Sequence, residues 1–538
     1  MNLLTEREKK LRYGKPWLTI LYFCIPTVLI MFIQGFYNII DKTLALQFAA
    51  GDLSSDPFYV ALYNQMKSTT VDIIPLKEMK IFINVATQYA TQTYNLLFAF
   101  AVMAGMGCAM NFSIAFGQRN EKKMHEITGN GFSFTIIFSI FISFMIFCLI
   151  FPGFNSVFIR SQMGGIYNPI TNYLAWDYSF LMLLAAPLMF LSYYFVSLLR
   201  SEGRMGWIVL IMVTSVLINS GAAIFFMKVC HLKMQGAMLG TVFSWLVQVI
   251  WGFIIVFRFR TSYTRFSWSN LIHLKFENIW LFLKAGLPNF IAGVSFVVVS
   301  FLSTSLVVNL PNQKIDNNVS ILQELMSSIS PWMGLIFSAA TGISQGARAV
   351  IAYNFGAKKY NRIWQILKRS SILFFVWFIF VLIMLASVGD KMMLMFAFPE
   401  EYVQQYRWWL LLSFASYPFA SFTLICFTLY QGINKSLLAS FTNSLRAFTI
   451  ALPMIGLGYL VATLTGNSIF YFLFFGLIDF VSSLILIPIL IQSWIKYKDK
   501  LIDVPDNFKI HKEHGETVTE KKEPSKKSTV KLKAKKHS

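Results

Sequence analysis

The feature that most constrains this chain is a succession of apolar stretches, each long enough to cross a bilayer. The hydrocarbon core of a bilayer takes about 20 residues of helix, and inside it a backbone must satisfy its own hydrogen bonds. Only 13% of the 538 residues are charged, against about a quarter in soluble domains. We therefore expect an all-α integral membrane protein. Twelve spans are predicted, near residues 17–41, 94–116, 131–152, 170–198, 206–228, 236–257, 278–308, 321–355, 371–389, 406–431, 437–463 and 469–493.

Basic residues are distributed unevenly between the connections. The N-terminal segment and the even-numbered connections together carry about twice as many Lys and Arg residues as the odd-numbered ones. Because cytoplasmic loops retain positive charge, we expect a multi-pass protein of the cell membrane with both termini cytoplasmic. The Lys-rich tail, residues 495–538, is expected to be disordered and to lie near anionic lipid headgroups. No nucleic-acid-reading motif accompanies these lysines, so no nucleic-acid partner is expected.

The two halves of the sequence repeat. Met106–Met124 is similar to Gln345–Trp364, and both segments carry two glycines ten residues apart before a basic loop. The first half is 23 residues longer between its proline and its first glycine, which places an insertion in the outer loop after the first span. The aligned positions are Pro26 with Pro288, Gly107 with Gly346, Gly117 with Gly356, Pro187 with Pro418, and Gly203 with Asn434.

The repeat predicts the architecture. Six spans return the chain to its starting side, so the halves share one orientation and are related by an axis along the membrane normal. Parallel repeats of this kind suit a transporter whose site lies between two rocking bundles. We expect twelve transmembrane helices in two pseudo-symmetric six-helix bundles. The predicted divisions are a cytoplasmic N-terminal segment (1–16), a first bundle (17–258), a basic and aromatic cytoplasmic linker (259–277), a second bundle (278–494) and the tail (495–538).

Four segments resemble the MATE family of multidrug and toxic-compound extrusion transporters. They are IPTVLIMFIQGFYNIIDKTL, LRSEGRMGWIVLIMVTSVLIN, GISQGARAVIAYNFGAKKYNRI and IDFVSSLILI, and together they cover both halves. The resemblance implies two bundles in a V shape. It also implies a secondary antiporter that exports amphipathic, often cationic, drugs or metabolites in exchange for protons or sodium, without a cofactor.

The resemblance also implies site residues. Asp41 matches the acid late in the first span, but Ala223 stands where the family pattern has a second acid four residues after Asn219. Protonation of Asp41 is therefore a simpler coupling than a sodium site. Arg348 replaces a residue that is more often uncharged, which favours a phosphate- or carboxylate-bearing substrate. The other matching positions are the polar residues Gln34, Tyr37 and Asn38 and the helix-bending prolines Pro26 and Pro288.

Charged residues inside spans are functional candidates because they are expensive there. Arg446 and Asp479 both lie about 15 Å deep, at 1.5 Å per residue, on consecutive helices, so we expect them to pair, either as a structural clamp or as a sensing pair. For Asp41, an interfacial carboxylate and a protonatable group in an outward-open cavity both stay open. Asp177 and Glu324 are expected in water at outer helix ends.

Two other functions are weighed against antiport. A flippase for a lipid-linked saccharide or phospholipid would use Arg348, Lys284 and the basic rim for a phosphate headgroup. Arginines lining both bundles would favour the flippase, whereas a single acidic face would favour drug export. A membrane enzyme would need a catalytic histidine, and the three outside the tail, His125, His231 and His273, have no plausible catalytic neighbour. We expect no enzyme, no metal site and a monomer.

Overall fold

The computed structural model describes residues 6–498, except 155, 164–166, 259–269, 272–273, 312, 314, 317–318 and 397, together with residues 508–513 and 516–521. Within these residues, eleven helices are long and apolar enough to cross a membrane, and the bent pair α8–α9 supplies a twelfth span. The predicted all-α fold with twelve spans is confirmed.

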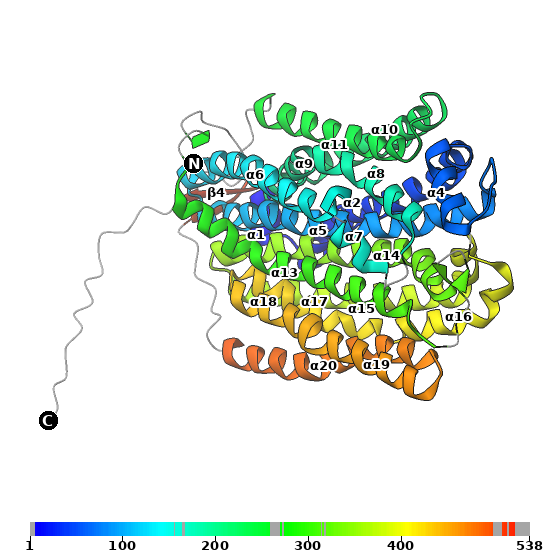
Figure 1. Cartoon of the computed structure of the whole chain (residues 1–538). Helices are drawn as coiled ribbons and strands as arrows, with labels where there is room; N and C mark the ends of the chain where they lie inside the picture. The colour runs from blue at the N-terminus through cyan, green and yellow to red at the C-terminus, as the bar shows by residue number, and fades with distance from the viewer. Residues whose placement is uncertain are drawn as a thin grey trace, which may run out of the picture.

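The first bundle lies in the upper half of Figure 1. Its elements are α1 (Glu6–Tyr13), α2 (Pro16–Leu44), the π-helix η1 (Ala45–Ala49), α3 (Ala50–Ser54), α4 (Pro57–Lys67), α5 (Leu76–Gln118), α6 (Glu121–Ile150), the 3₁₀ turn η2 (Pro152–Phe154), α7 (Val157–Arg160), the 3₁₀ turn η3 (Ser161–Met163), α8 (Pro169–Leu184), α9 (Ala186–Ser201), α10 (Met205–Lys228) and α11 (Lys233–Arg258).

The second bundle lies below it in the same view. Its elements are α13 (Phe276–Val307), the paired strands β1 (Ile315–Asp316) and β2 (Val319–Ser320), α14 (Ile321–Gly356), α15 (Tyr360–Leu394), α16 (Glu400–Phe414), α17 (Tyr417–Gly432), α18 (Ser436–Ser444), the π-helix η4 (Leu445–Ala451), α19 (Leu452–Thr465) and α20 (Ile469–Lys498).

The aligned positions of the repeat have the same structural role in both halves. Pro187 lies in the first turn of α9, after a 58° bend from α8, and Pro418 lies in the first turn of α17, after the end of α16. Proline suits a first turn because the missing N–H has no helical partner there. Gly203 and Asn434 both adopt positive φ, 80° and 58°, which glycine and asparagine tolerate best.

Four long helices form the seam between the bundles. In the centre of Figure 1, α2 packs along α14 and α13 packs along α5, while α5 and α14 also contact each other. The repeat exchanges α2 with α13 and α5 with α14, so the two outer contacts of the seam are equivalent. This is the arrangement expected for an axis that runs along the spans.

Glycines close one end of the seam. We call this the inner end; it contains α1 and the last residues of α5 and α14. A methyl group at Gly356 of α14 would lie 2.5 Å from the carbonyl oxygen of Ile114 in α5, and one at Gly117 of α5 would meet the carbonyl oxygen of Tyr353 in α14. The two contacts are reciprocal, because the repeat pairs these glycines with each other. Two backbones therefore touch without an intervening side chain.

The first glycine of each pair lies at a contact between a central and a flanking helix of the seam, α14 with α2 and α5 with α13. A methyl group at Gly346 would lie 2.9 Å from the carbonyl oxygen of Phe23 in α2, and one at Gly107 would meet that of Phe282 in α13. The four glycines that the repeat pairs with each other therefore all lie at close contacts between helices of different bundles.

The N-terminal segment also crosses the seam at the inner end. Arg362, at the start of α15, donates to the carbonyl oxygens of Leu11 at 2.9 Å and Gly14 at 2.7 Å. The amide of Asn354 in α14 donates to the Leu11 carbonyl at 3.2 Å. The segment that leads into the first bundle is thus held by the second.

The insertion after the first span forms α3 and α4 over the outer end of the first bundle. The Tyr59 hydroxyl donates to Asp177 of α8 at 2.6 Å. Asp56, which caps α4, forms an ion pair with Lys233 of α11. Burial alone would raise the pKa of Asp56, but Lys233 and the Phe58 N–H lower it. Asp177 and Glu324 were both expected in water. Asp177 is instead hydrogen-bonded to Tyr59, and Glu324 is buried.

The linker and the tail are described only in part. Most of the linker lies outside the described residues, but its Lys275 forms an ion pair with Glu126 of α6 at 2.9 Å. In the tail, where the sequence predicts disorder, β3 (Phe508–Glu513) pairs antiparallel with β4 (Glu516–Lys521). The high Lys content favours disorder, but a short local hairpin needs only main-chain pairing.

The glycine crossing is testable with alanine substitutions. Gly356→Ala should lower the free energy of unfolding by about 1–3 kcal/mol, because a methyl group overpacks a backbone contact. Gly221→Ala in α10 is the matched control, since nothing lies within 4 Å of a methyl group there. Thermal unfolding of the purified variants measures both. Equal melting temperatures for the two variants would contradict the crossing.

Candidate functional site

Asp41 lies near the end of α2 and turns into the first bundle. Its side chain is buried, and its Oδ2 accepts hydrogen bonds from the hydroxyls of Thr241 in α11 at 2.7 Å and Tyr178 in α8 at 3.4 Å. Its Oδ1 has no hydrogen-bond partner among the described residues. A buried carboxylate oxygen without a partner is costly as an anion, so this position favours a bound proton or cation.

Asn219, one of the positions that the resemblance implies, belongs to the same network. Its amide donates to the Thr241 hydroxyl at 2.9 Å, while its carbonyl oxygen is buried without a partner in the described part of the chain. Ala223 packs against Gly240 of α11, where an added methyl group would lie 2.7 Å from the Ala223 side chain. The small Ala223 side chain therefore allows α10 and α11 to pack closely at this position.

Lys42 points away from its neighbour Asp41 and toward the second bundle. It is buried, and its Nζ donates to the Ser327 carbonyl of α14 at 2.6 Å and lies 5.0 Å from the centre of the Phe396 ring. Adjacent residues of a helix are about 100° apart, which separates the two side chains. Asp41 thus contacts the first bundle, and Lys42 contacts the second.

A cavity of about 50 Å³ lies at the seam on the outer side of the glycine crossing. Lys42 is the charged side chain in its lining. The rest of the lining comes from polar groups of α5, Tyr178 of α8, Phe296 of α13 and a turn of α14 around Pro331. A cavity of this size holds a few water molecules and is too small for a drug-sized ligand. The seam is therefore nearly closed in this structure.

The remaining residues predicted on the first span are described only by their backbone. Gln34, Tyr37 and Asn38 lie in α2, but their side chains fall outside the described part of the structure. Pro26 and Pro288 lie inside α2 and α13, and both helices continue through them. The predicted bending at these prolines therefore does not interrupt either helix.

Arg446 and Asp479 form the predicted ion pair. Arg446 Nε lies 2.6 Å from Asp479 Oδ1, and Nη2 donates to Oδ2 at 3.0 Å. Arg446 lies in η4, a widened turn directly before Pro453, which has no N–H to donate. Such π turns are frequent at functional sites. The pair joins α20 to this turn within the second bundle.

Arg348 is buried inside the second bundle. Its Nη1 donates to Asn289 of α13 at 2.7 Å and to the amide oxygen of Gln431 in α17, and its guanidinium lies 4.6 Å from the centre of the Phe427 ring. Lys284, which we expected to act with Arg348, is exposed on α13. Only Arg348 of that pair therefore faces the interior.

Among the described residues, four cations that lie outside the predicted spans are buried, namely Arg12, Lys42, Arg200 and Arg204. Arg200 falls in the connection predicted between residues 198 and 206, but it is the last residue but one of α9 and is 1% exposed. It donates to the amide oxygen of Gln345 in α14, across the seam. Its depth was concealed because the apolar stretch 170–198 ends before it. An arginine directly after an apolar run was the available signal.

Comparison with protein families identifies the chain. The MatE family model matches residues 85–224 and 288–457, which together exceed half of the chain and lie in both bundles. The chain belongs to the MatE family. As a MATE transporter it is a multi-pass membrane protein and not an enzyme, and its two matched regions follow the repeat described above.

Two relatives are similar to this chain in sequence. Uncharacterized protein MG447 homolog of Mycoplasmoides gallisepticum is 21% identical over 68% of this chain and 70% of its own length. Probable multidrug resistance protein YoeA of Bacillus subtilis is 21% identical over 51% of this chain and 57% of its own.

The structural neighbours are similar in fold alone. One, described as an outward-facing conformation of a multidrug resistance MATE family transporter, has a TM-score of 0.73 at 16% identity and covers 92% of this chain and 99% of its own. Another, described as the MATE multidrug transporter DinF-BH, has a TM-score of 0.74 at 18% identity, covering 91% of this chain and 98% of its own.

The Arg446–Asp479 pair in this MATE transporter predicts the outcome of a double-mutant cycle. Arg446→Met should cost about 3–5 kcal/mol, because it leaves a buried carboxylate unpaired. Asp479→Leu should cost a comparable amount, because it leaves a guanidinium unpaired at the same depth in the membrane. The double variant should be milder than the sum, as measured by denaturant unfolding.

The half-exposed pair of Arg407 and Asp390, also 3.0 Å apart, is the matched control. Exposed pairs contribute at most about 1 kcal/mol, so Arg407→Met should have a small effect. Strict additivity in the Arg446 cycle would show that those two residues do not interact.

Proposed function

We propose that this MATE transporter is a secondary active antiporter of the cell membrane, with both termini cytoplasmic. It exports amphipathic small molecules in exchange for protons or sodium ions by alternating access. The observation that carries the proposal is the buried Asp41 carboxylate, which has one free oxygen and three polar neighbours, Thr241, Tyr178 and Asn219.

Asp41 is suited to coupling because its charge is poorly compensated. No basic side chain forms an ion pair with it in the described part of the chain, and Lys42 is committed to Ser327. A proton on Oδ1 would remove the cost of burying the anion. A sodium ion would need further oxygen ligands, and in this network of described side chains the carbonyl oxygen of Asn219 is the other oxygen without a partner. Protonation is therefore the simpler coupling reaction.

The seam supports alternating access. The glycine crossing closes the inner end, and the cavity beside Lys42 lies on its outer side. Opposite rocking of the two bundles would open the crossing and close the cavity. Asp41 lies in the first bundle close to Tyr178, which lines that cavity, so its proton could be exchanged with the outside.

A second candidate function is a flippase for a lipid-linked saccharide or phospholipid. The observation that favours it is the sign of the charge in the cavity, where Lys42 supplies a cation and no carboxylate belongs to the lining. A cationic drug would be repelled by Lys42, whereas a phosphate headgroup would be attracted.

Asp41→Asn tests the antiport. The amide mimics the protonated acid, so substrate should still bind while gradient-driven export falls at least tenfold. Vesicles that contain the purified protein, an imposed proton or sodium gradient and a fluorescent amphipathic dye measure the transport. Asp52→Asn is the control, because Asp52 lies in the outer insertion beside the exposed His231. Full gradient-driven export by Asp41→Asn would refute this coupling.

A further inference from the structure

The guanidinium of Arg200 has an unused donor edge. The side chain is 1% exposed, and its Nη1 contacts the Gln345 amide oxygen and, at 3.9 Å, the sulfur of Met106. Nε and Nη2 are buried and have no hydrogen-bond partner among the described residues. A buried unpaired cation is costly, and its unmade hydrogen bonds add to the cost.

Nε and Nη2 form the edge that binds planar anions. Two parallel N–H groups on this edge match two oxygens of a carboxylate or a phosphate. The chain contains a filled example of the same edge, since Arg446 uses Nε and Nη2 to hold the two oxygens of Asp479 at 2.6 and 3.0 Å. Arg200 presents the same donors without an acid.

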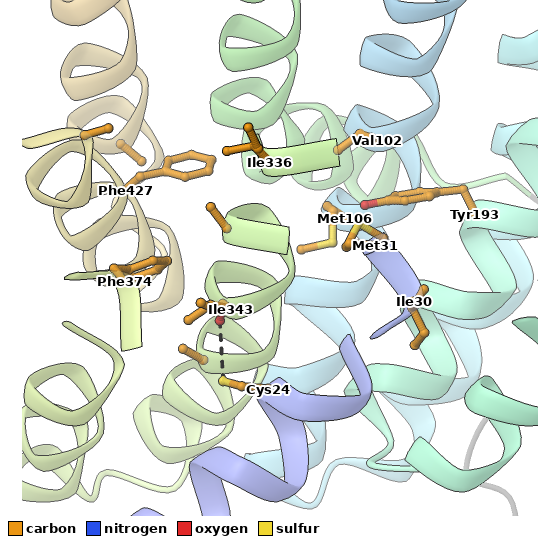
Figure 2. Packing of buried hydrophobic residues seen from close by; sticks show 14 of the residues in the cluster. Cys24, Ile30, Met31, Val102, Met106, Tyr193, Ile336, Ile343, Phe374 and Phe427 are labelled. Carbon is orange, nitrogen blue, oxygen red and sulfur yellow. Dashed lines mark hydrogen bonds between the residues drawn. The ribbon is translucent and has the colours of Figure 1, made fainter. Parts of the chain in front are cut away.

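A second arginine and a tyrosine lie beside Arg200. Gln345, the partner of Arg200, lies one turn before Arg348 on α14, and Tyr193 lies two turns before Arg200 on α9, so each pair of residues shares one face of its helix. The Tyr193 hydroxyl is buried near Arg200, but it makes no hydrogen bond of ordinary length with the described residues. Figure 2 shows its side chain pointing toward Met106 and Met31. The cluster thus holds two cations and a free hydroxyl.

Neutral amides occupy the place of a counter-ion in this cluster. Gln345 accepts from Arg200, and Asn289 and Gln431 accept from Arg348. Amide oxygens satisfy individual N–H groups but carry no net charge. Among the described residues, the hydrogen-bond partners of the two arginines are therefore neutral, and the positive charge of the cluster is not compensated by them.

The repeat separates these arginines from the scaffold. Pro187 and Gly203 are each 231 residues before their counterparts Pro418 and Asn434, and at the same spacing Arg200 corresponds to Gln431. The paired glycines are 239 residues apart, and at that spacing Arg348 corresponds to Ala109. Each bundle therefore contributes one arginine, but from a different span. Neither arginine therefore belongs to the positions that the two halves share.

We propose that Arg200, with Arg348 and Tyr193, forms a binding site for the phosphate or carboxylate group of the transported substrate. The proposal deepens the proposed export function and rests on it, and because each bundle supplies one arginine it also meets the condition given above for a flippase. It assigns an anionic amphipath as the substrate class, bound when the inner end of the seam is open.

Opening of the seam would complete this site. Arg200 belongs to the first bundle and Gln345 to the second, so rocking of the bundles separates them and frees Nη1 in addition to the unused edge. Arg348 keeps its partners, because Asn289 and Gln431 move with its own bundle. An anion would then replace Gln345 and neutralise the cluster. Anion binding would therefore stabilise the state that is open at the inner end.

The test is a binding measurement with the full-length protein in phosphatidylcholine nanodiscs. Isothermal titration calorimetry gives the Kd of phenyl phosphate, with benzyl alcohol and benzyltrimethylammonium as neutral and cationic probes of similar size. Arg200→Gln should weaken phenyl phosphate binding at least tenfold and leave the Kd of benzyl alcohol unchanged. Arg200→Lys should recover only part of the affinity, because an ammonium lacks the two-pronged edge. Arg407→Gln, at the outer end, should have no effect.

Two further arms make the result decisive. If Arg200→Gln does not fold, Tyr193→Phe removes one hydroxyl and should still weaken phenyl phosphate binding severalfold. Phosphatidylglycerol in the nanodiscs should compete with phenyl phosphate if the natural ligand is a lipid headgroup, and should leave its Kd unchanged if the ligand is a soluble organic anion. An unchanged Kd in the Arg200 and Tyr193 variants would overturn the site.

Failure of this inference is distinguishable from failure of the antiport. Asp41→Asn should bind phenyl phosphate like the wild type, because Asp41 contacts Thr241 and Tyr178 and not the arginine cluster. If phenyl phosphate binding depends on Arg200 but export does not depend on Asp41, only the proposed coupling is refuted. If export depends on Asp41 but phenyl phosphate binding does not depend on Arg200, only the anion site is refuted.

Discussion

The contact on which the rest of this structure depends is the direct touch of two backbones where α5 crosses α14. Gly117 and Gly356 each meet a carbonyl oxygen of the other helix, and a side chain at either position would force the helices apart. Because α2 packs on α14 and α13 on α5, this crossing also fixes the outer contacts of the seam. The cavity, Lys42 and the arginine cluster all lie along that seam.

Much of this fold follows from patterns that sequence displays directly. Long apolar runs give the spans, because hydrocarbon admits only helices that satisfy their own backbone. The repeat is visible because glycines at crossings and prolines at broken spans tolerate few replacements, and Gly203 and Asn434 share a left-handed backbone. The Arg446–Asp479 pair was predictable from depth, since two opposite charges in hydrocarbon have few alternatives to each other.

The site was predictable only in part, because residue position does not determine the direction of a side chain. Asp41 and Lys42 are adjacent, yet one serves α11 and the other α14. Arg200 lies just after the apolar run 170–198 and outside the predicted spans, although it belongs to α9 and its side chain is buried. Both features depend on rotation about a helix axis or on the depth at which a span ends, and these are set by packing against other helices.

The N-terminal segment gives the seam a tether of fixed reach. Only Gly14 and Lys15 separate α1 from α2, and a fully extended chain spans about 3.3–3.6 Å per residue. α1 therefore cannot remain on the second bundle if the start of α2 moves away by more than this slack. Wide separation at the inner end requires the bonds from Arg362 and Asn354 to break. The distance over which the inner end can open before these hydrogen bonds break is thus set by two residues of chain.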